Sequence, residues 1–280
     1  YPGLANSWAV GKDGRTVYFR LDPSARYSDG QPVKVSDYFF FFYFMRSKHV
    51  QAPWYNDYYG KEKFEKIVLY DEETLSITFY KGKPDLLERV SVRGKPEHFY
   101  VELDGEFLSK YQWNPEPTTG AYVALPENVD KGKSVTLVRQ KNWWADQKRF
   151  FRNRFNPDKI KVSVIRDYNK SFEVFLKGEV DMFGLAKTEF WYDKLPNDHP
   201  LVTNGYLSKV TFFNQTPPPS YALRINSQKA PLDDLHVRLG IHHSMNFQLV
   251  IDKIFRGDFV RMNSVADGYG DRSHPTLRAR

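Results

Sequence analysis

Three consecutive prolines, Pro217 to Pro219, constrain the fold of this chain more than any other feature. Each ring fixes the backbone angle φ and removes an N–H donor, so the run cannot lie inside a helix or a central strand. The run therefore separates the residues before it from the residues after it. Directly after it, Tyr221 to Asn226 has alternating apolar positions and predicts a short strand that crosses between two bodies. We expect a helix after this crossing, from about Leu235 to Phe255.

The composition is that of a folded globular protein. The 280 residues suffice for one large domain or two ordinary ones, and 16% of them are aromatic. The chain has no cysteine, which excludes thiol catalysis, zinc–thiolate sites, iron–sulfur clusters and disulfides. It opens at Tyr1 without a basic and apolar leader, so we interpret its start as lying within a domain.

The longest apolar run, Tyr38 to Met45, predicts a helix that is buried on nearly all sides. We expect this helix to extend from about Ser36 to Lys48, with Ser36 as its N-cap and Asp37 at the positive end of the helix dipole. The run is far too short to cross a bilayer, which takes about 20 residues, so no transmembrane segment is expected. A helix lying on a membrane surface is the alternative.

The formal net charge of +7 raises the question of a nucleic-acid partner. A nucleic-acid binder usually clusters its positive charge on one face. Here the one dense basic stretch runs from Gln147 to Arg154, and acidic residues are spread evenly elsewhere. We interpret this stretch as a solvated loop and expect no nucleic-acid partner.

Hydrophobic periodicity and turn residues predict a chain of mixed α/β class. The turns Gly11 to Gly14 and Asp71 to Glu73 join strands into hairpins, and an aromatic loop runs from Ala52 to Gly60. A strand, a helix and a strand between residues 158 and 185 resemble a βαβ-like unit of an α/β lobe. Strands are expected at residues 4–10, 16–21, 64–71, 74–80, 118–124, 134–139, 158–164 and 180–185, an extended segment at 202–211, and helices at 84–90, 107–113, 168–176 and 189–195.

Four groups of motifs, collinear and covering nearly the whole chain, carry a family resemblance. They are Leu4 to Val10 with Val17 to Leu21, Tyr27 to Val33 and Asp37; Thr118 to Tyr122 with Arg139 and Asn142 to Trp144; Phe175 to Met182; and Leu223 to Arg238. Together they resemble the family 5 extracellular solute-binding proteins, the substrate receptors of peptide and nickel ABC importers. The aromatic loop, Arg152 to Asn156 and Asp267 to Asp271 look most like the YejA branch, which serves oligopeptide uptake. Lys34 to Asp37 and Asn246-Phe247 depart from the family pattern without touching an assigned ligand contact.

The resemblance implies a two-lobed fold similar to that of periplasmic binding proteins. It assigns residues 1–117 to a β-rich subdomain of lobe one, residues 118–217 to the α/β part of lobe one, and residues 218–280 to the hinge strand and first helix of lobe two. Family members carry a segment before Leu4 and most of lobe two after Arg280, so we expect this chain to be a fragment. The segment directly after the prolines would then be the hinge.

The resemblance also implies a function. The protein would be a receptor that captures oligopeptides, including peptide antibiotics, in the periplasm by closing two lobes around them. It would deliver them to an inner-membrane ABC permease, as a monomer that is no enzyme and uses no cofactor. A receptor of the same fold for a nickel chelate or a glycoside is the alternative. An envelope hydrolase is a weaker one, because no nucleophile motif supports it.

A receptor for peptides of varied sequence should hold their main chain with exposed strand edges. Two stretches suit this role: one at the end of the strand near residue 183, where a glycine permits close approach, and one in the crossing strand. Tyrosine rings would supply walls, and an arginine would meet a carboxylate. The expected ligand-binding residues are Tyr58, Tyr59, Phe183, Gly184, Leu185, Ser220, Tyr221, Ala222 and Arg224.

Catalytic and metal chemistry finds little support in the sequence. His236 and His243 are two helical turns apart, about 10 Å, which is too far for one ion without a third element, so no metal site is expected. Asp233 and Asp234 stand just before the predicted helix, where acidic residues serve as N-terminal caps more often than as a catalytic pair.

Overall fold

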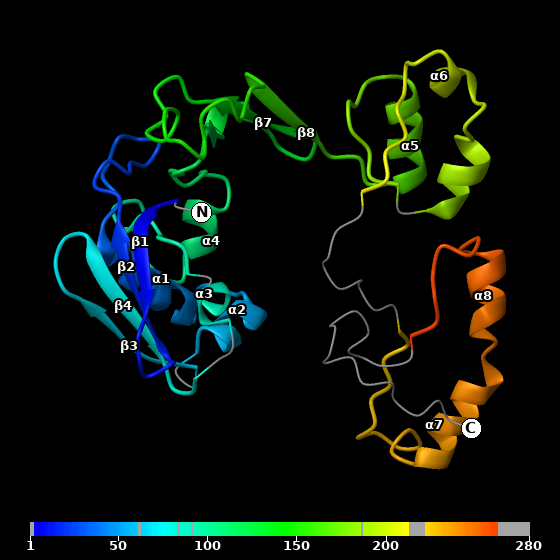
Figure 1. Ribbon diagram of the computed structural model, residues 1–280, viewed down its shortest axis with the longest axis horizontal. Coiled ribbons are helices and arrows are strands. Elements are labelled where there is room, and N and C mark those ends of the chain that lie inside the picture. The colour runs from blue at the N-terminus through cyan, green and yellow to red at the C-terminus, as the bar shows by residue number, and fades with distance from the viewer. Residues whose placement is uncertain are drawn as a thin grey trace. The chain divides into compact units, whose positions relative to one another are not determined.

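The computed structural model describes residues 3–60, 63–82, 85–90, 92–185, 187–212 and 222–262. The chain divides into two compact units, Tyr1–Lys170 and Ser171–Arg280 (Figure 1). The mixed α/β class expected from the sequence is confirmed. The subdomain boundaries expected at residues 117 and 217 stay predictions. Among the described helices, none is long and apolar enough to cross a membrane.

The first unit begins with a four-stranded antiparallel sheet (Figure 1). Both predicted hairpins form in it. In the first turn, Asp13 accepts hydrogen bonds from the backbone N–H groups of Arg15 and Thr16, and Gly14 adopts φ +63°. In the second, Asp71 accepts from the N–H groups of Glu73 and Thr74 in the same way. The sheet order is β1-β2-β4-β3, with β1 at Ala5–Val10, β2 at Thr16–Leu21, β3 at Phe64–Leu69 and β4 at Thr74–Phe79.

The aromatic helix α1 (Val35–Arg46) packs against this sheet. The prediction that Ser36 caps it is wrong: the N-cap position is Lys34, and Asp37 reaches back to accept a hydrogen bond from the Lys34 N–H at 2.8 Å. A carboxylate three residues into a helix satisfies an otherwise unpaired donor in this way. Within the run from Tyr38 to Phe44, most rings are buried and two are exposed, Phe39 at 55% and Tyr43 at 60%.

Short helices complete this part of the first unit. The segment predicted as an aromatic loop instead forms helix α2 (Pro53–Tyr58). Pro53 suits the first turn of a helix, and the Asn56 side chain accepts a hydrogen bond from the Ala52 N–H at 3.0 Å. The predicted helices near residues 84–90 and 107–113 are confirmed as α3 (Leu86–Arg89) and α4 (Phe107–Tyr111).

A second antiparallel sheet comes next in the chain. Only two residues of the strand expected at 118–124 pair, while the strands expected near 134–139 and 158–164 are confirmed. Ahead of the short strand, the carbonyl of Thr119 accepts hydrogen bonds from the indole N–H groups of Trp143 and Trp144, so this backbone is held by side chains and not by a ladder. The elements are β5 (Tyr122–Val123), η1 (Pro126–Asn128), β6 (Val129–Asp130), β7 (Ser134–Arg139) and β8 (Lys159–Ser163).

The second unit is built on a small aromatic core. Helix α5 (Tyr168–Leu176), inside which the boundary between the units falls, stacks Phe172 on Phe190 with ring centroids 4.2 Å apart. Phe190 opens a π-helical turn, η2 (Phe190–Lys194), which confirms the helical prediction for 189–195. The strand predicted at residues 180–185 does not form, so the expected βαβ-like unit is wrong. The ring of Phe183 packs on Phe172 and Phe175. This packing, and not hydrogen bonds to a neighbouring strand, positions the segment.

The remaining elements of the second unit are short helices. Residues 202 and 203, predicted to be extended, end helix α6 (Pro200–Thr203). The single helix predicted after the crossing is two helices, α7 (Leu235–Ser244) and α8 (Phe247–Lys253). Asn246 lies between the two helices and is the N-cap of α8. Its side-chain oxygen accepts a hydrogen bond from the Leu249 N–H at 3.0 Å. Residues 222–226 form no strand, because a strand exists only within a ladder and no described segment pairs with them.

Candidate ligand-binding surfaces

Helix α2 presents an aromatic face on the first unit. Trp54 and Tyr58 are four residues apart, so they lie on one side of the helix and stack with centroids 5.2 Å apart and planes 10° apart. Trp54 is 66% exposed and Tyr55 is 49% exposed. The ammonium of Lys63 lies 4.4 Å from the ring centroid of Tyr58. This arrangement exposes aromatic rings, with a cation over the ring of Tyr58.

The two tyrosines predicted to line the site have different surroundings. Tyr58 is half-buried, and its hydroxyl donates to the carbonyl of Arg89 at 3.2 Å. Tyr59 is only 4% exposed and packs edge-on against Phe41 at 4.7 Å, and burial raises the pKa of its phenol. Tyr59 therefore belongs to the core of the first unit and offers no wall to a ligand in this conformation. Its neighbours on the chain, Trp54 and Tyr55, are the accessible rings that the sequence reasoning missed.

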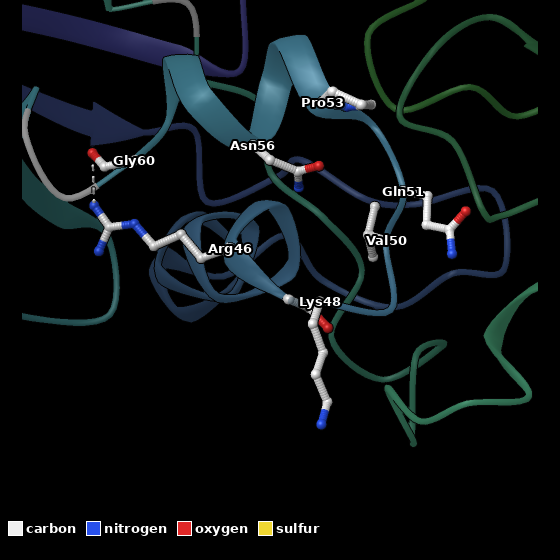
Figure 2. Close-up of a pocket in the computed structure, with 8 residues that line it drawn as sticks. Arg46, Lys48, Val50, Gln51, Pro53, Asn56 and Gly60 are labelled. Atoms are coloured by element: carbon white, nitrogen blue, oxygen red, sulfur yellow. Dashed lines mark hydrogen bonds between the residues drawn. The ribbon is translucent and has the colours of Figure 1, made fainter.

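A hollow of about 690 Å³ lies beside α1 and α2 (Figure 2). Arg46 points toward Gly60, donating to the carbonyls of Tyr59 at 2.8 Å and Gly60 at 3.5 Å, and burial lowers the pKa of its guanidinium. Lys48 extends away from that pair in the same view. The guanidinium of Arg46 is therefore engaged by carbonyls, and it links the end of α1 to the end of α2.

A second hollow, of about 890 Å³, is lined by residues 24, 26–30, 115–117, 123–126, 140–142 and 144 of the first unit. Its acidic groups are engaged. Glu116 accepts from the ammonium of Lys95 and the hydroxyl of Tyr100, both at 2.6 Å, and Asp29 lies 2.7 Å from the Nε2 atom of His98. Burial is the main cause that raises the pKa of Tyr100. None of the expected ligand-binding residues that the structure describes lines this hollow.

In the second unit, the predicted stretch from Phe183 to Leu185 lies after helix α5. Phe183 is half-buried, anchored by ring contacts of 5.7 Å to Phe172 and 5.4 Å to Phe175. Gly184 is exposed, and a Cβ built on it would meet no atom within 4 Å. The space beside its Cα therefore admits the close approach of another main chain. Leu185 is half-buried.

The other predicted stretch is only partly described. Ser220 and Tyr221 lie outside the described residues. Ala222 and Arg224 are exposed, and no described acidic side chain pairs with Arg224. Within the part of the chain that the structure describes, the backbone of residues 222–225 makes no hydrogen bond. This stretch therefore carries a row of main-chain donors and acceptors that no described segment satisfies.

Two polar side chains at the ends of α7, those of Asp234 and His242, make contacts within the protein. Asp234 is the N-cap of α7 and accepts from the His236 N–H at 2.6 Å, as the sequence predicted for acids at this position. His242 contacts the guanidinium of Arg261 at 3.1 Å. Among the described residues, no three histidine, aspartate or glutamate side chains cluster closely enough to hold a metal ion.

The family resemblance is confirmed by comparison with known proteins. The family model of the bacterial extracellular solute-binding proteins, family 5 (middle), matches residues 1–276. The chain therefore belongs to the family 5 bacterial extracellular solute-binding proteins. Its relatives include BMEII0691 of Brucella melitensis, 28% identical over 96% of this chain and 42% of the relative, and the peptidoglycan-binding protein YepA of Agrobacterium fabrum, 24% identical over 91% and 42%. YejA of Escherichia coli is 25% identical over 98% and 44%. The chain thus spans less than half the length of these relatives.

Solved structures share the fold. NikZ of Campylobacter jejuni, in complex with Ni(L-His), is 17% identical with a TM-score of 0.70 over 94% of this chain and 48% of that chain. A periplasmic oligopeptide-binding protein of Thermotoga maritima with mannohexaose bound is 17% identical with a TM-score of 0.68 over 94% and 46%. OppA of Haemophilus influenzae, in complex with RPPGFSPFR, is 20% identical with a TM-score of 0.66 over 90% and 49%. At these identities the likeness establishes the fold and leaves the ligand open.

Proposed function

We propose that this protein is the substrate-binding receptor of an ABC importer, and that it captures oligopeptides, including peptide antibiotics, in the periplasm. Family membership supports the solute-binding role, and the OppA complex gives a precedent for a peptide-like ligand on this fold. In this proposal the receptor is a monomer without enzymatic activity. It closes two lobes about a hinge near residues 218–226 and delivers its ligand to an inner-membrane permease.

The observation that carries the peptide proposal is the main chain of residues 222–225. Its N–H and C=O groups make no hydrogen bond within the described part of the chain, and Ala222, Leu223 and Arg224 are exposed. An extended peptide adds a strand to such a backbone through main-chain hydrogen bonds, which are the same for every ligand sequence. A stretch of this kind therefore suits a receptor that tolerates varied side chains.

Two further features support main-chain recognition. The open space beside Gly184 leaves room for a ligand backbone, and Phe183 fixes that position through its packing on α5. Arg224 is exposed and has no described acidic partner, so in our proposal it pairs with a peptide carboxylate. In our proposal Gly184 and residues 222–224 contact the ligand backbone.

Calorimetric titration with backbone-modified peptides tests this proposal. One peptide of a length that binds is compared with versions carrying alternate N-methyl groups, which remove N–H donors without changing side chains. A matched set replaces side chains by alanine. Main-chain recognition predicts that N-methylation weakens binding by about fivefold for each lost hydrogen bond, since such bonds contribute about 1 kcal/mol. Equal losses in the two sets, or no binding of any peptide, would refute it.

A second candidate ligand is a saccharide-bearing one, and the exposed face of α2 favours it. Trp54 and Tyr55 are large rings open to solvent, and flat aromatic walls pack well against the apolar faces of sugar rings. YepA, a relative, is named as a peptidoglycan-binding protein, and the Thermotoga maritima complex holds mannohexaose.

Variants of α2 separate the two candidates. Trp54→Ala removes the exposed ring and should weaken a glycan ligand about fivefold while leaving the affinity for a simple oligopeptide within about twofold, because one stacked ring contributes about 1 kcal/mol. The matched control is Trp113→Ala, which removes a 48% exposed indole elsewhere in the first unit. If Trp54→Ala and Trp113→Ala affect glycan affinity alike, the saccharide candidate fails.

A further inference from the structure

Residues 147–161, the basic segment, carry most of the chain's excess charge. The segment holds six lysine and arginine residues and one aspartate, which leaves a formal +5 of the chain's +7. Lys148 is paired, because its ammonium lies 2.7 Å from the carboxylate of Asp22. The other five cations have no described acidic partner and, like the segment as a whole, belong to the first unit; they are Arg149, Arg152, Arg154, Lys159 and Lys161.

The backbone of this segment is fixed by turns. The N–H of Lys148 donates to the carbonyl of Ala145 at 3.0 Å, and the N–H groups of Phe151 and Arg152 both donate to the carbonyl of Lys148 at 2.9 Å. At its far end, the carbonyl of Asp158 accepts from the Arg139 N–H at 2.9 Å, where strand β8 begins to pair with β7. These hydrogen bonds give the segment a defined backbone conformation.

Two residues of the segment adopt backbone angles that are costly for side chains. Asn153 has φ +62° and Phe155 has φ +58°. The left-handed region is uncommon for any residue with a Cβ, and for a bulky aromatic such as Phe155 it is a genuine outlier. The ring of Phe155 packs 5.3 Å from Trp143, which holds it in place. Strain of this kind tends to persist where the resulting shape is used.

This shape keeps the rings inside and the guanidinium groups outside. Phe151 and Phe155 pack on Trp143, while Arg149, Arg152 and Arg154 are exposed. The guanidinium of Arg154 lies 5.4 Å from the ring centroid of Phe155. The exposed arginines are therefore attached to a backbone that the packed rings hold in place. They are spread along the segment and have no described acidic partner.

We propose that the basic segment is a docking surface for the anionic headgroups of a phospholipid membrane. A small anion is bound by donors that converge on one point. The arginines of this segment are instead spread along the chain, so they do not suit a small anion. An anionic bilayer instead presents a plane of phosphate groups that many separate cations can meet at once, and each arginine can bind a phosphate through two parallel N–H groups. Membrane binding through this segment does not depend on which ligand the protein transports.

Vesicle co-sedimentation tests the proposal. The protein is mixed at low salt with vesicles of phosphatidylcholine and phosphatidylglycerol, or with vesicles of phosphatidylcholine alone. We expect sedimentation only with the anionic vesicles, and its loss at high salt. The triple variant R149Q/R152Q/R154Q should lower the partition coefficient on the order of a hundredfold, since each cation near an anionic surface contributes about a fivefold factor. Circular dichroism checks that this variant folds.

A matched variant and a competing polyanion complete the experiment. K12Q/K177Q/K229Q removes the same number of charges at exposed positions outside the segment and should leave partition within a few fold of the unmodified protein. Three outcomes would overturn the proposal: no sedimentation with anionic vesicles at low salt, equal losses in the two triple variants, or binding to poly-glutamate without binding to vesicles. The last result would indicate an acidic protein partner.

Discussion

The backbone N–H of Glu97 donates a hydrogen bond to the carboxylate of Asp37 at 3.2 Å, joining two parts of the first unit that are 60 residues apart in the chain. The other oxygen of Asp37 accepts from the Lys34 N–H at 2.8 Å. Asp37 is only 3% exposed. One carboxylate thus begins helix α1 and fastens the loop that passes over it.

Removing this carboxylate should destabilise the first unit. Asp37→Ala leaves the N–H groups of Lys34 and Glu97 without their acceptor, at a cost of about 1–3 kcal/mol for each donor that stays buried. Urea unfolding followed by tryptophan fluorescence measures the loss. Asp37→Asn keeps the shape and one acceptor oxygen, so it should cost less than Asp37→Ala. If the two variants are equally stable, the hydrogen bonds to Asp37 contribute little.

The same carboxylate should give the protein a distinctive pH dependence. Burial is the main cause that raises the pKa of Asp37 above its usual 3.8, while its backbone donors partly oppose the shift. Between 3.8 and the raised pKa, the folded state binds more protons than the unfolded state, so this contribution to stability falls as pH rises through that window.

Comparison with Asp37→Asn isolates that contribution, because the other carboxylates titrate alike in both proteins. The free energy of unfolding is measured from about pH 4 to about pH 7 for the two proteins. As the pH rises, the free energy of unfolding of the unmodified protein should fall relative to that of Asp37→Asn. A difference that is flat, or that moves in the other direction, would show that Asp37 does not titrate as its burial predicts.

Two tyrosines four residues apart, Tyr55 in α2 and Tyr59 at its C-cap, should differ sharply in their effect on stability. Tyr59→Ala empties a buried aromatic site and should cost about 3–5 kcal/mol. Tyr55→Ala, on the same helix but 49% exposed, should change stability by about 0.5 kcal/mol or less. Denaturant midpoints provide the comparison. Similar midpoints for the two variants would contradict the difference in burial between the two rings.

The cap of α7 offers a test with a neighbouring control. Asp234 accepts from the His236 N–H, whereas the side chain of Asp233 makes no hydrogen bond among the described residues. Asp234→Ala should therefore destabilise the second unit by about 1 kcal/mol, and Asp233→Ala, with the same change in charge, by much less. Amide hydrogen exchange in residues 235–238 reports the loss locally. Equal exchange in the two variants would contradict the assignment of the cap.

Arg224 should matter only to ligands with a free carboxylate. Arg224→Ala should weaken a peptide acid by roughly tenfold, because a hydrogen bond to a charged group contributes about 1.5–3 kcal/mol. The same variant should bind the matching peptide amide as the unmodified protein does. Lys229→Ala, which removes an exposed cation a few residues away, is the control. A loss that is equal for acid and amide would exclude a carboxylate contact.

Local signals predicted the elements that local interactions hold. The hairpins at Asp13 and Asp71, the helix at residues 168–176 and the cap at Asp234 were predictable because their hydrogen bonds lie within a few residues. The strand predicted at 180–185 failed, because alternation does not say whether a partner strand is present. The helix break at Asn246 had a signal, since asparagine is a strong N-cap, but the continuing apolar pattern outweighed it.

The candidate site was less predictable than the fold. Tyr58 and Tyr59 are one residue apart on a helix, so they point in directions about 100° apart, and the sequence cannot tell which of them faces the core. That choice depends on Phe41 and Phe64, which come from other elements. The backbone at residues 222–225 was predicted as a site because its chemistry needs no particular side chain, and its contact with ligand stays a prediction.

The most direct test of the central proposal is to identify the ligand that the protein itself selects. The protein is purified from a bacterial periplasmic extract, denatured, and the released small molecules are analysed by mass spectrometry beside those from an Arg224→Ala preparation. We predict a mixture of oligopeptides of varied sequence, with free-carboxylate forms depleted in the variant. Release of a metal chelate or a peptide-free glycan as the main species would contradict the account.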